Sequence, residues 1–416
     1  MRHEPRPLLR AALELVNAAN GLRPLGRRGY VTLPVFAGGW LTTELAPLLL
    51  GGSMLDAVRR GRRGDFAGVR GKTALALTGA AWAALAVQYG RGLTSGTTLQ
   101  AALRDGLGSD YEAVLAAPAG TPSTTGRRRG ALRTSLVRRH YVEKRDTVSY
   151  GPHGWANLAD VWRRRDLPRD GTAPVLVYVP GGAWALGWRR GQAYPLLSHL
   201  AAHGWVCVSV NYRVSPAHTW PAHIVDVKRA LAWVKDNIAS FGGDPTFVAI
   251  TGGSAGGHLA ALAALTPNDP RFQPGFADAD TSVAAAVPIY GRYDWFSTEG
   301  TGRPEFLAYL QKFVVKRKLA DDPQVFFDAS PIDQPTPKAP PFFVLHGSDD
   351  SIIPVGEARS FVATLREVSG APVVYAELPG AQHAFDTFGS PRAHQTAHAV
   401  RQFLSWVYAR SPAVAD

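Results

Sequence analysis

The segment that most constrains the fold of this chain is GGSAG at residues 252–256. It follows an apolar, β-branched run at 247–251 and precedes an Ala/Leu-rich run at 258–265. This order predicts a strand, a sharp turn and a helix, with Ser254 at the tip of the turn. Glycines suit the flanking positions because a Cβ there would collide with the neighbouring strand and helix. The pattern therefore favours a serine whose hydroxyl projects from the backbone as a nucleophile.

A nucleophilic serine needs a base within hydrogen-bond reach, and that base needs an acid to orient it. Behind such a turn, the acid and then the histidine follow the serine along the chain. An apolar run at 341–346 leads into a loop with Asp349 and Asp350, and a second run at 372–378 leads through a Pro-Gly turn to His383. All of these positions follow predicted parallel strands, whose carboxyl ends meet at one edge of a sheet. We therefore expect His383 to be the base and one of the two aspartates to be the acid.

The remaining histidines are interpreted as structural. His258 is expected to pack or cap beside the turn, and His346 to support the loop that carries the acid. His394 and His398 lie four residues apart on the last predicted helix, but no third ligand has suitable spacing. We therefore predict no metal site and no cofactor.

A third requirement is a set of backbone N–H donors for the negative charge that develops during acyl transfer. The strand-like run at 175–179 is followed by Pro180-Gly181-Gly182-Ala183-Trp184. Small residues at this position allow the backbone to approach a substrate closely. Its place before the serine turn favours an oxyanion-binding loop over an ordinary Gly-Gly turn.

Four motifs together carry a family resemblance: PGGAW at 180–184, NYRVSP at 211–216, GGSAGGHLA at 252–260 and HGSDDSIIP at 346–354. Across about residues 145–410 the chain resembles the hormone-sensitive-lipase-like bacterial carboxylesterases and, more broadly, the alpha/beta-hydrolase-3 group. The resemblance implies an α/β-hydrolase fold, with a mostly parallel, doubly wound sheet and a helical cap. It also implies a catalytic triad of Ser254, Asp350 and His383. The oxyanion hole would be formed by Gly181, Gly182, Ala183 and Ala255, with the N–H groups of Gly182, Ala183 and Ala255 as its donors.

The chain departs from the family pattern at three positions. Pro180 replaces the usual histidine, Ala183 replaces the third glycine of that motif, and Gly253 replaces the usual aspartate before the serine. Backbone donors survive these changes, whereas the residues that hold the loops must differ. The expected function is hydrolysis of carboxylic esters through an acyl-enzyme. Amide or formamide hydrolysis or carbohydrate deacetylation by the same triad, and a membrane-tethered binding protein with a vestigial triad, are the alternatives.

Charge is concentrated in the N-terminal third of the chain. Residues 1–145 hold 22 Lys and Arg against 9 Asp and Glu, whereas residues 146–416 hold 23 against 24. The basic clusters come with no nucleic-acid motif and no interleaved aromatic residues, so nucleic-acid binding is not expected. Attraction to anionic lipid headgroups explains the excess better.

Hydropathy supports a membrane surface as the partner. Residues 31–50 are long enough to cross a bilayer although Glu44 interrupts them, and residues 73–87 form a shorter apolar run behind a basic loop at 59–72. We expect either a helical hairpin in the membrane or two helices packed on the catalytic part as a lid. No secretory signal precedes them, so the protein is expected at a membrane and otherwise in the cytoplasm. The single cysteine, Cys207, excludes a disulfide within the chain, and nothing in the sequence fixes the oligomeric state.

These patterns divide the chain into a helical, basic extension at 1–116, a linker at 117–145 and a catalytic domain at 146–410. Within the catalytic domain, regular alternation of strands and helices stops at 291–340, where aromatic residues gather in a cap-like insertion. Trp184, Trp295 and Phe313 are predicted to bind the acyl part of the substrate. Replacing Trp295 or Phe313 by alanine is therefore expected to change the preferred chain length.

Overall fold

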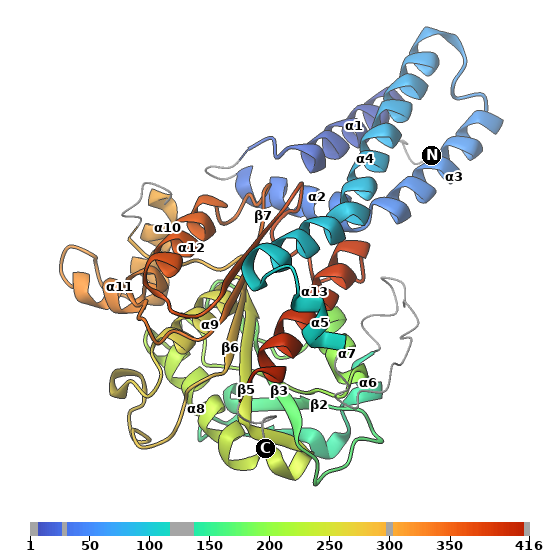
Figure 1. Cartoon of the computed structure of the whole chain (residues 1–416). Coiled ribbons are helices and arrows are strands. Elements are labelled where there is room, and N and C mark those ends of the chain that lie inside the picture. Colours follow the sequence, from blue (N-terminus) through green and yellow to red (C-terminus); the bar gives the residue numbers. More distant parts are fainter. Residues whose placement is uncertain (1–6, 27–30, 117–136, 297–302, 412–416) are drawn as a thin grey trace.

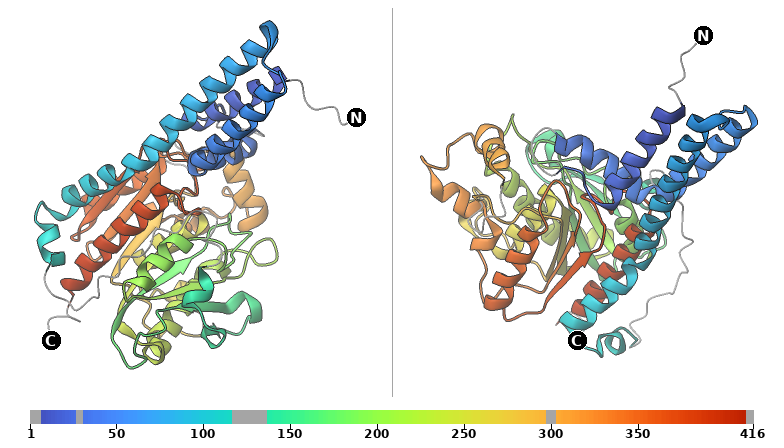
Figure 2. Two further views of the ribbon diagram at one scale, coloured as in Figure 1. Left: turned by 90° about the vertical axis from the view of Figure 1, so that its right-hand side faces the viewer. Right: turned by 90° about the horizontal axis from the view of Figure 1, so that it is seen from above.

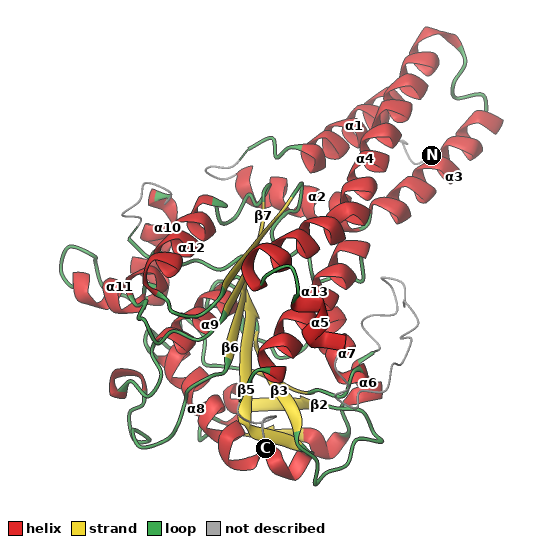
Figure 3. Cartoon of the chain, viewed as in Figure 1, coloured by secondary structure: helices red, strands yellow, loops and turns green. Residues whose placement is uncertain are grey.

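An eight-stranded sheet forms the centre of the computed structural model, which describes residues 7–26, 31–116, 137–296 and 303–411 (Figures 1 and 3). The strands lie in the order β1-β2-β4-β3-β5-β6-β7-β8. β2 pairs antiparallel with both β1 and β4, and all later pairs are parallel. The strands are β1 Thr147–Ser149, β2 Leu158–Trp162, β3 Ala173–Val179, β4 Val206–Val210, β5 Gly243–Gly253, β6 Ala285–Ile289, β7 Phe342–Gly347 and β8 Val373–Leu378.

Helices cover both faces of this sheet, as the alternating sequence predicts. Along β3, Val175, Val177 and Val179 face the core beneath α8, α9 and α12, whereas Leu176 and Tyr178 face α7, α13 and α4. The helices are α7 Tyr194–Ala202, α8 Ala222–Asn237, α9 Ala255–Leu265, α12 Gly356–Val368 and α13 Pro391–Ala409. The structure therefore confirms the mostly parallel, doubly wound α/β fold.

The N-terminal extension consists of α1 Pro7–Leu22, α2 Thr32–Glu44, α3 Ala46–Arg62, α4 Gly68–Leu107 and α5 Tyr111–Ala116. Figures 1 and 2 show α1, α3 and the N-terminal half of α4 projecting away from the sheet, and we call these three elements the helical arm. The C-terminal half of α4 packs on β8 and α13 instead. Leu99, Leu103 and Leu107 are buried there in one core with β3, β6 and β7. The boundary expected at 116/117 therefore does not separate two cores.

The apolar segment at 31–50 is divided between two helices. α2 and α3 meet at Leu45 at an angle of 86°. Among the described helices, none is alone long and apolar enough to cross a membrane, while this bent pair passes the test as a unit. The expected basic loop at 59–72 is also mostly helical, because α3 continues to Arg62 and α4 begins at Gly68.

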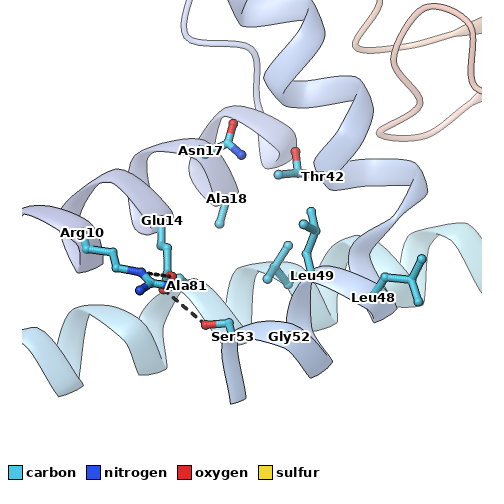
Figure 4. A pocket seen from close by; sticks show the side chains of 11 residues that line it. Arg10, Glu14, Asn17, Ala18, Thr42, Leu48, Leu49, Gly52, Ser53 and Ala81 are labelled. Atoms are coloured by element: carbon cyan, nitrogen blue, oxygen red, sulfur yellow. Dashed lines mark hydrogen bonds and ion pairs between the residues drawn. The ribbon is translucent and has the colours of Figure 1, made fainter. Parts of the chain in front are cut away.

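A cavity of about 270 Å³ lies between α1, α2, α3 and α4 (Figure 4). Ala18, Leu49 and Leu85 give it an apolar lining. Three of the polar side chains that line it interact with one another: Glu14 accepts a hydrogen bond from Ser53 and forms an ion pair with Arg10. This cavity belongs to the helical arm and has none of the predicted site residues in its walls.

The predicted linker and cap differ in how much structure they carry. Residues 117–136 lie outside the described part of the chain, but α6 Arg138–Tyr141 is folded, and Arg138 bonds the buried Asp160 at 2.7 Å. The expected cap contains α10 Pro304–Tyr309, a π-helical turn at Leu310–Val314, and α11 Pro323–Ala329. Residues 297–302 of this segment also lie outside the described part.

Candidate active site

Ser254 occupies the sharp turn between β5 and α9. Its backbone has φ +57° and ψ −122°, a conformation that non-glycine residues rarely adopt. The turn is packed so closely that a Cβ at Gly256 would lie 2.0 Å from the Val179 carbonyl oxygen, and one at Gly252 would lie 2.4 Å from the Gly256 carbonyl oxygen. The Ser254 N–H donates to the Ile289 carbonyl at 3.0 Å, which fixes the turn against β6. The glycines of the GGSAG segment are thus required by the space available.

His383 and Asp350 come together at the carboxyl ends of β8 and β7. The His383 Nδ1–H donates to Asp350 Oδ2 at 2.6 Å, and Asp350 is almost completely buried. The other oxygen, Oδ1, accepts the backbone N–H groups of Ile352 and Ile353, both at 2.8 Å. Of the two aspartates that the sequence offers, Asp350 is the one bonded to His383.

The carboxylate of Asp350 is held in its charged form. Burial alone would raise its pKa, but His383 and His346 beside it outweigh burial and hold the pKa well below the usual range. His346 lies 3.3 Å from Asp350 Oδ2, and its Nε2–H donates to the Ile353 carbonyl at 3.0 Å. His346 therefore supports the acid loop, as predicted.

Tyr290 connects the serine turn with the histidine. Its ring centroid lies 4.7 Å from that of His383, and a Cβ at Gly253 would lie 2.7 Å from its hydroxyl oxygen. The hydroxyl donates to the buried carboxylate of Asp386. Burial raises the pKa of Tyr290 well above its usual value and also raises that of Asp386. Gly253, where the family usually has aspartate, leaves the space that Tyr290 fills.

Sequence reasoning missed the Tyr290–Asp386 pair. The two residues are 96 positions apart, so no local motif joins them. The available local signal was Gly253, which departs from the family pattern and leaves room for the Tyr290 ring.

The loop after β3 has the strained backbone expected of a close approach to a ligand. Gly182, Ala183 and Trp184 have φ values of +133°, +51° and +57°. The Gly181 N–H donates to Gln192 Oε1 at 2.9 Å, so this donor is used within the fold. Ala255 is the first residue of α9, where a backbone N–H has no acceptor within the helix. Gly181, which the sequence predicts as part of the oxyanion hole, therefore has its N–H engaged by Gln192.

Trp184 and Trp295 do not occupy the positions expected of substrate-binding residues. Both are buried in an aromatic cluster with Trp220 and His258, with Trp184 and Trp295 at a centroid distance of 5.1 Å. The Trp184 indole donates to His258 Nδ1 at 3.2 Å, and burial lowers the pKa of His258 to about 3. This packing leaves neither tryptophan side chain accessible in the structure.

Phe313 differs from the two tryptophans because it is partly exposed on the cap. Its ring packs at a tilt against that of Tyr309, with a centroid distance of 5.5 Å. The Tyr309 hydroxyl in turn donates to the Ala183 carbonyl at 2.7 Å. The cap is thereby fastened to the loop that follows β3.

His394 and His398, considered above as possible metal ligands, both lie on α13. Within the described ranges, no group of three or more His, Cys, Asp or Glu side chains is arranged to hold a metal ion. His398 on α13 instead packs edge-on against the His199 ring at 5.9 Å.

The chain is similar in sequence to curated carboxylic ester hydrolases. The family model described as BD-FAE matches residues 166–365. The chain is 51% identical over 410 residues to the probable carboxylic ester hydrolase LipM of Mycobacterium tuberculosis, covering 97% of this chain and 93% of LipM. It is 45% identical over 375 residues to the esterase LipQ of the same organism, covering 89% and 84% of the two chains.

Solved structures support the fold. The butyrate-bound esterase Est2 of Thermogutta terrifontis aligns with a TM-score of 0.54 and 22% identity, covering 63% of this chain and 93% of Est2. A truncated carbohydrate esterase from gut microbiota aligns with a TM-score of 0.53 and 22% identity, covering 64% and 97% of the two chains. The sheet order, the serine turn and the identity to LipM and LipQ lead to one assignment: the chain belongs to the carboxylic ester hydrolase family of LipM and LipQ, with the α/β-hydrolase fold.

Proposed function

We propose that this protein hydrolyses carboxylic esters in two steps, with Ser254 as nucleophile, His383 as base and Asp350 as the orienting acid. Two observations carry the proposal together: the 2.6 Å hydrogen bond between His383 and the buried Asp350, and the strained turn that carries Ser254. A carboxylate bonded to Nδ1 leaves Nε2 as the nitrogen that accepts a proton. With Nε2 unprotonated, His383 is in the state that can accept the proton of the Ser254 hydroxyl.

The reaction then follows from the positions of these groups. His383 takes the proton of Ser254 as the hydroxyl oxygen attacks the acyl carbon, and Asp350 stabilises the charged imidazole. The N–H groups of Gly182, Ala183 and Ala255 bind the oxyanion. His383 gives the proton to the leaving alcohol. In the second step His383 takes a proton from water as the water attacks the acyl carbon, and it then gives that proton to the Ser254 oxygen as the acid leaves. In this scheme the buried Trp184 and Trp295 do not contact the substrate. Of the three residues predicted to bind the acyl part, Phe313 is the one that contacts an acyl chain.

The test is hydrolysis of p-nitrophenyl esters of increasing acyl length by the wild type and by Ser254→Ala. The proposal expects activity in the wild type and a loss of several orders of magnitude in the variant. Ser198→Ala removes a partly buried hydroxyl on α7 that donates to the Pro195 carbonyl; this variant is the matched control and is expected to retain full activity. Ester activity that survives in Ser254→Ala would refute the assignment.

The same assay separates the alternative reactions. Turnover of anilides, formamides or acetylated sugars in preference to every ester would favour an amidase or a deacetylase on the same residues. A folded wild type that neither turns over any substrate nor reacts with a serine-directed phosphonate would favour a binding protein with a vestigial triad.

We also propose that the helical arm binds an anionic membrane surface. Exposed apolar side chains, Leu48, Leu49, Met54, Leu55 and Val58, lie on α3 beside exposed basic ones, Arg59 and Arg62. Leu9, Leu13 and Val16 of α1 are exposed as well. An apolar face combined with basic residues is the composition of helices that lie in the headgroup region.

Flotation with vesicles tests this second proposal. We expect binding to vesicles with 30% phosphatidylserine and weaker binding to phosphatidylcholine alone, since each basic residue near an anionic surface adds roughly 1 kcal/mol. Leu55→Glu should reduce binding, whereas Val368→Glu, on an exposed position of α12, should not. Equal binding by Leu55→Glu and the wild type would exclude this face of α3.

A further inference from the structure

One face of α2 lies along the loop that carries His383. Phe36, Trp40 and Glu44 are spaced four residues apart and therefore project from the same side of the helix. The segment 382–392 contacts each of them in turn. Elsewhere on α2, Leu33 and Leu41 are exposed. The inward face thus belongs to the catalytic part of the molecule, although the helix lies in the N-terminal extension (Figure 1).

The contacts begin at the histidine itself. The Phe36 ring meets the His383 imidazole edge-on at a centroid distance of 6.0 Å. On the neighbouring turn of α2, a Cβ at Gly39 would lie 3.2 Å from the side-chain nitrogen of Gln382. A side chain at position 39 would therefore crowd Gln382.

Gln382 extends this contact to the acid loop. Its side-chain oxygen accepts the Ser351 N–H at 2.7 Å and the His383 N–H at 2.9 Å. Since Ser351 directly follows Asp350, the side chain that touches α2 also fixes the backbone beside the acid and the base.

The next contact holds a strained residue. Ala384 has φ +60°, a left-handed conformation that a non-glycine residue keeps only where its surroundings enforce it. The Trp40 indole N–H donates to the Ala384 carbonyl at 2.8 Å, and its ring stacks on Phe388 at 4.6 Å. Trp40 therefore supplies both a hydrogen bond and a packing surface that enforce the turn next to His383.

The last contact is an ionic anchor. Glu44 accepts hydrogen bonds from Ser390 at 2.6 Å and from the guanidinium of Arg392. Ser390 also caps α13, where its hydroxyl accepts the Ala393 N–H at 3.1 Å. The histidine loop is thus tied to α2 at its start, in its middle and at its end.

We propose that α2 belongs to the catalytic apparatus, with Phe36 and Trp40 as positioning residues that hold the His383 loop in its productive conformation. The inference rests on the proposed role of His383 as the base. A helix of the N-terminal extension thereby has a role in catalysis, which is separate from the proposed membrane binding of the helical arm. A displacement of the imidazole by about 1 Å costs on the order of 10²-fold in rate, so small changes at these contacts are measurable.

The experiment uses the full chain and p-nitrophenyl acetate, a water-soluble ester that requires no membrane. Trp40→Phe keeps the ring that stacks on Phe388 but removes the N–H donor, and it should lower kcat about tenfold with KM changed less than twofold. Trp40→Ala removes both contacts and should lower kcat further. Leu41→Ala, the adjacent exposed position on α2, is the matched control and should match the wild type.

The outcomes separate this inference from the proposed function. Wild-type turnover that disappears in Ser254→Ala, together with unchanged kcat in folded Trp40→Phe and Phe36→Leu, would overturn the inference alone. Absence of Ser254-dependent turnover in the wild type would overturn both. Phe36→Leu provides the second measurement if a Trp40 variant fails to fold, and it too should lower kcat with little effect on KM.

Discussion

The ion pair between Glu44 and Arg392 joins the N-terminal extension to α13, and its removal gives a quantitative test of the packing. Both side chains are buried, with side-chain exposures of 0% and 1%. Arg392 also donates to Ser95 of α4 at 3.3 Å. Replacing Arg392 by methionine preserves much of the volume but leaves the Glu44 carboxylate buried with Ser390 as its remaining described partner.

The expected cost follows from that burial. Breaking a buried ion pair by removal of one partner destabilises a protein by about 3–5 kcal/mol. Unfolding entropy of about 2.1 cal/mol/K per residue converts this, for a chain of 416 residues, into a fall in Tm of about 3–6 °C. The measurement is a thermal melt of wild type and Arg392→Met at one scan rate. Arg359→Met is the control, because Arg359 pairs with Glu377 at the surface and should cost less than about 1 kcal/mol.

A double variant distinguishes loss of the ion pair from loss of packing. Glu44→Leu with Arg392→Met removes both charges, so most of the stability should return. Two outcomes would refute the reasoning. One is an Arg392→Met cost no larger than that of Arg359→Met, and the other is a double variant as unstable as the sum of the single variants.

Three further predictions concern single side chains. Asp350→Asn should lower kcat by about 10³–10⁴-fold because the amide no longer orients and stabilises a charged His383. The folded-state pKa of Asp350 is lowered, so the stability that the ionised carboxylate confers is complete above its ordinary pKa of about 4 and is lost as the pH falls below that value. The melting temperatures of wild type and Asp350→Asn should therefore converge in acid. Gly253→Ala should reduce kcat and Tm together, since its Cβ would lie 2.7 Å from the hydroxyl of the buried Tyr290; wild-type kinetics would contradict this contact. Burial lowers the pKa of Lys228 to about 7 in the folded protein. Between pH 7 and about 10.5 the unfolded chain therefore binds more protons than the folded one, and the free energy of unfolding should rise with pH. Thermal melts of Lys228→Met should lack this rise.

The sequence predicted those parts of the site that local patterns encode. Ser254 lies in a motif whose glycines are dictated by the backbone of its own turn, and Asp350 and His383 each follow a strand that is recognisable by itself. Parallel pairing then brings the three strand ends to one edge of the sheet without further information.

The parts that were missed depend on contacts between distant segments. Trp40 and Ala384 are separated by 344 positions, and nothing in the apolar run at 31–50 indicates that one of its faces meets a histidine loop. The hydropathy of this run likewise gives no sign that Glu44 forms an ion pair with Arg392 of α13. Trp184 and Trp295 were predicted to bind substrate because an aromatic residue near a site has the same signature whether it lines a cavity or packs behind it.

The length of α4 has a practical consequence for any attempt to isolate the catalytic part. Its 40 residues run about 60 Å without a break, from the tip of the arm to the outer edge of the sheet. A fragment that begins at residue 146 would lose Leu99, Leu103 and Leu107 and leave bare the apolar surface that these side chains cover on β8 and α13. Expression trials that shorten this protein should therefore keep the whole of α4, and a soluble fragment without it would imply that α13 and β8 rearrange.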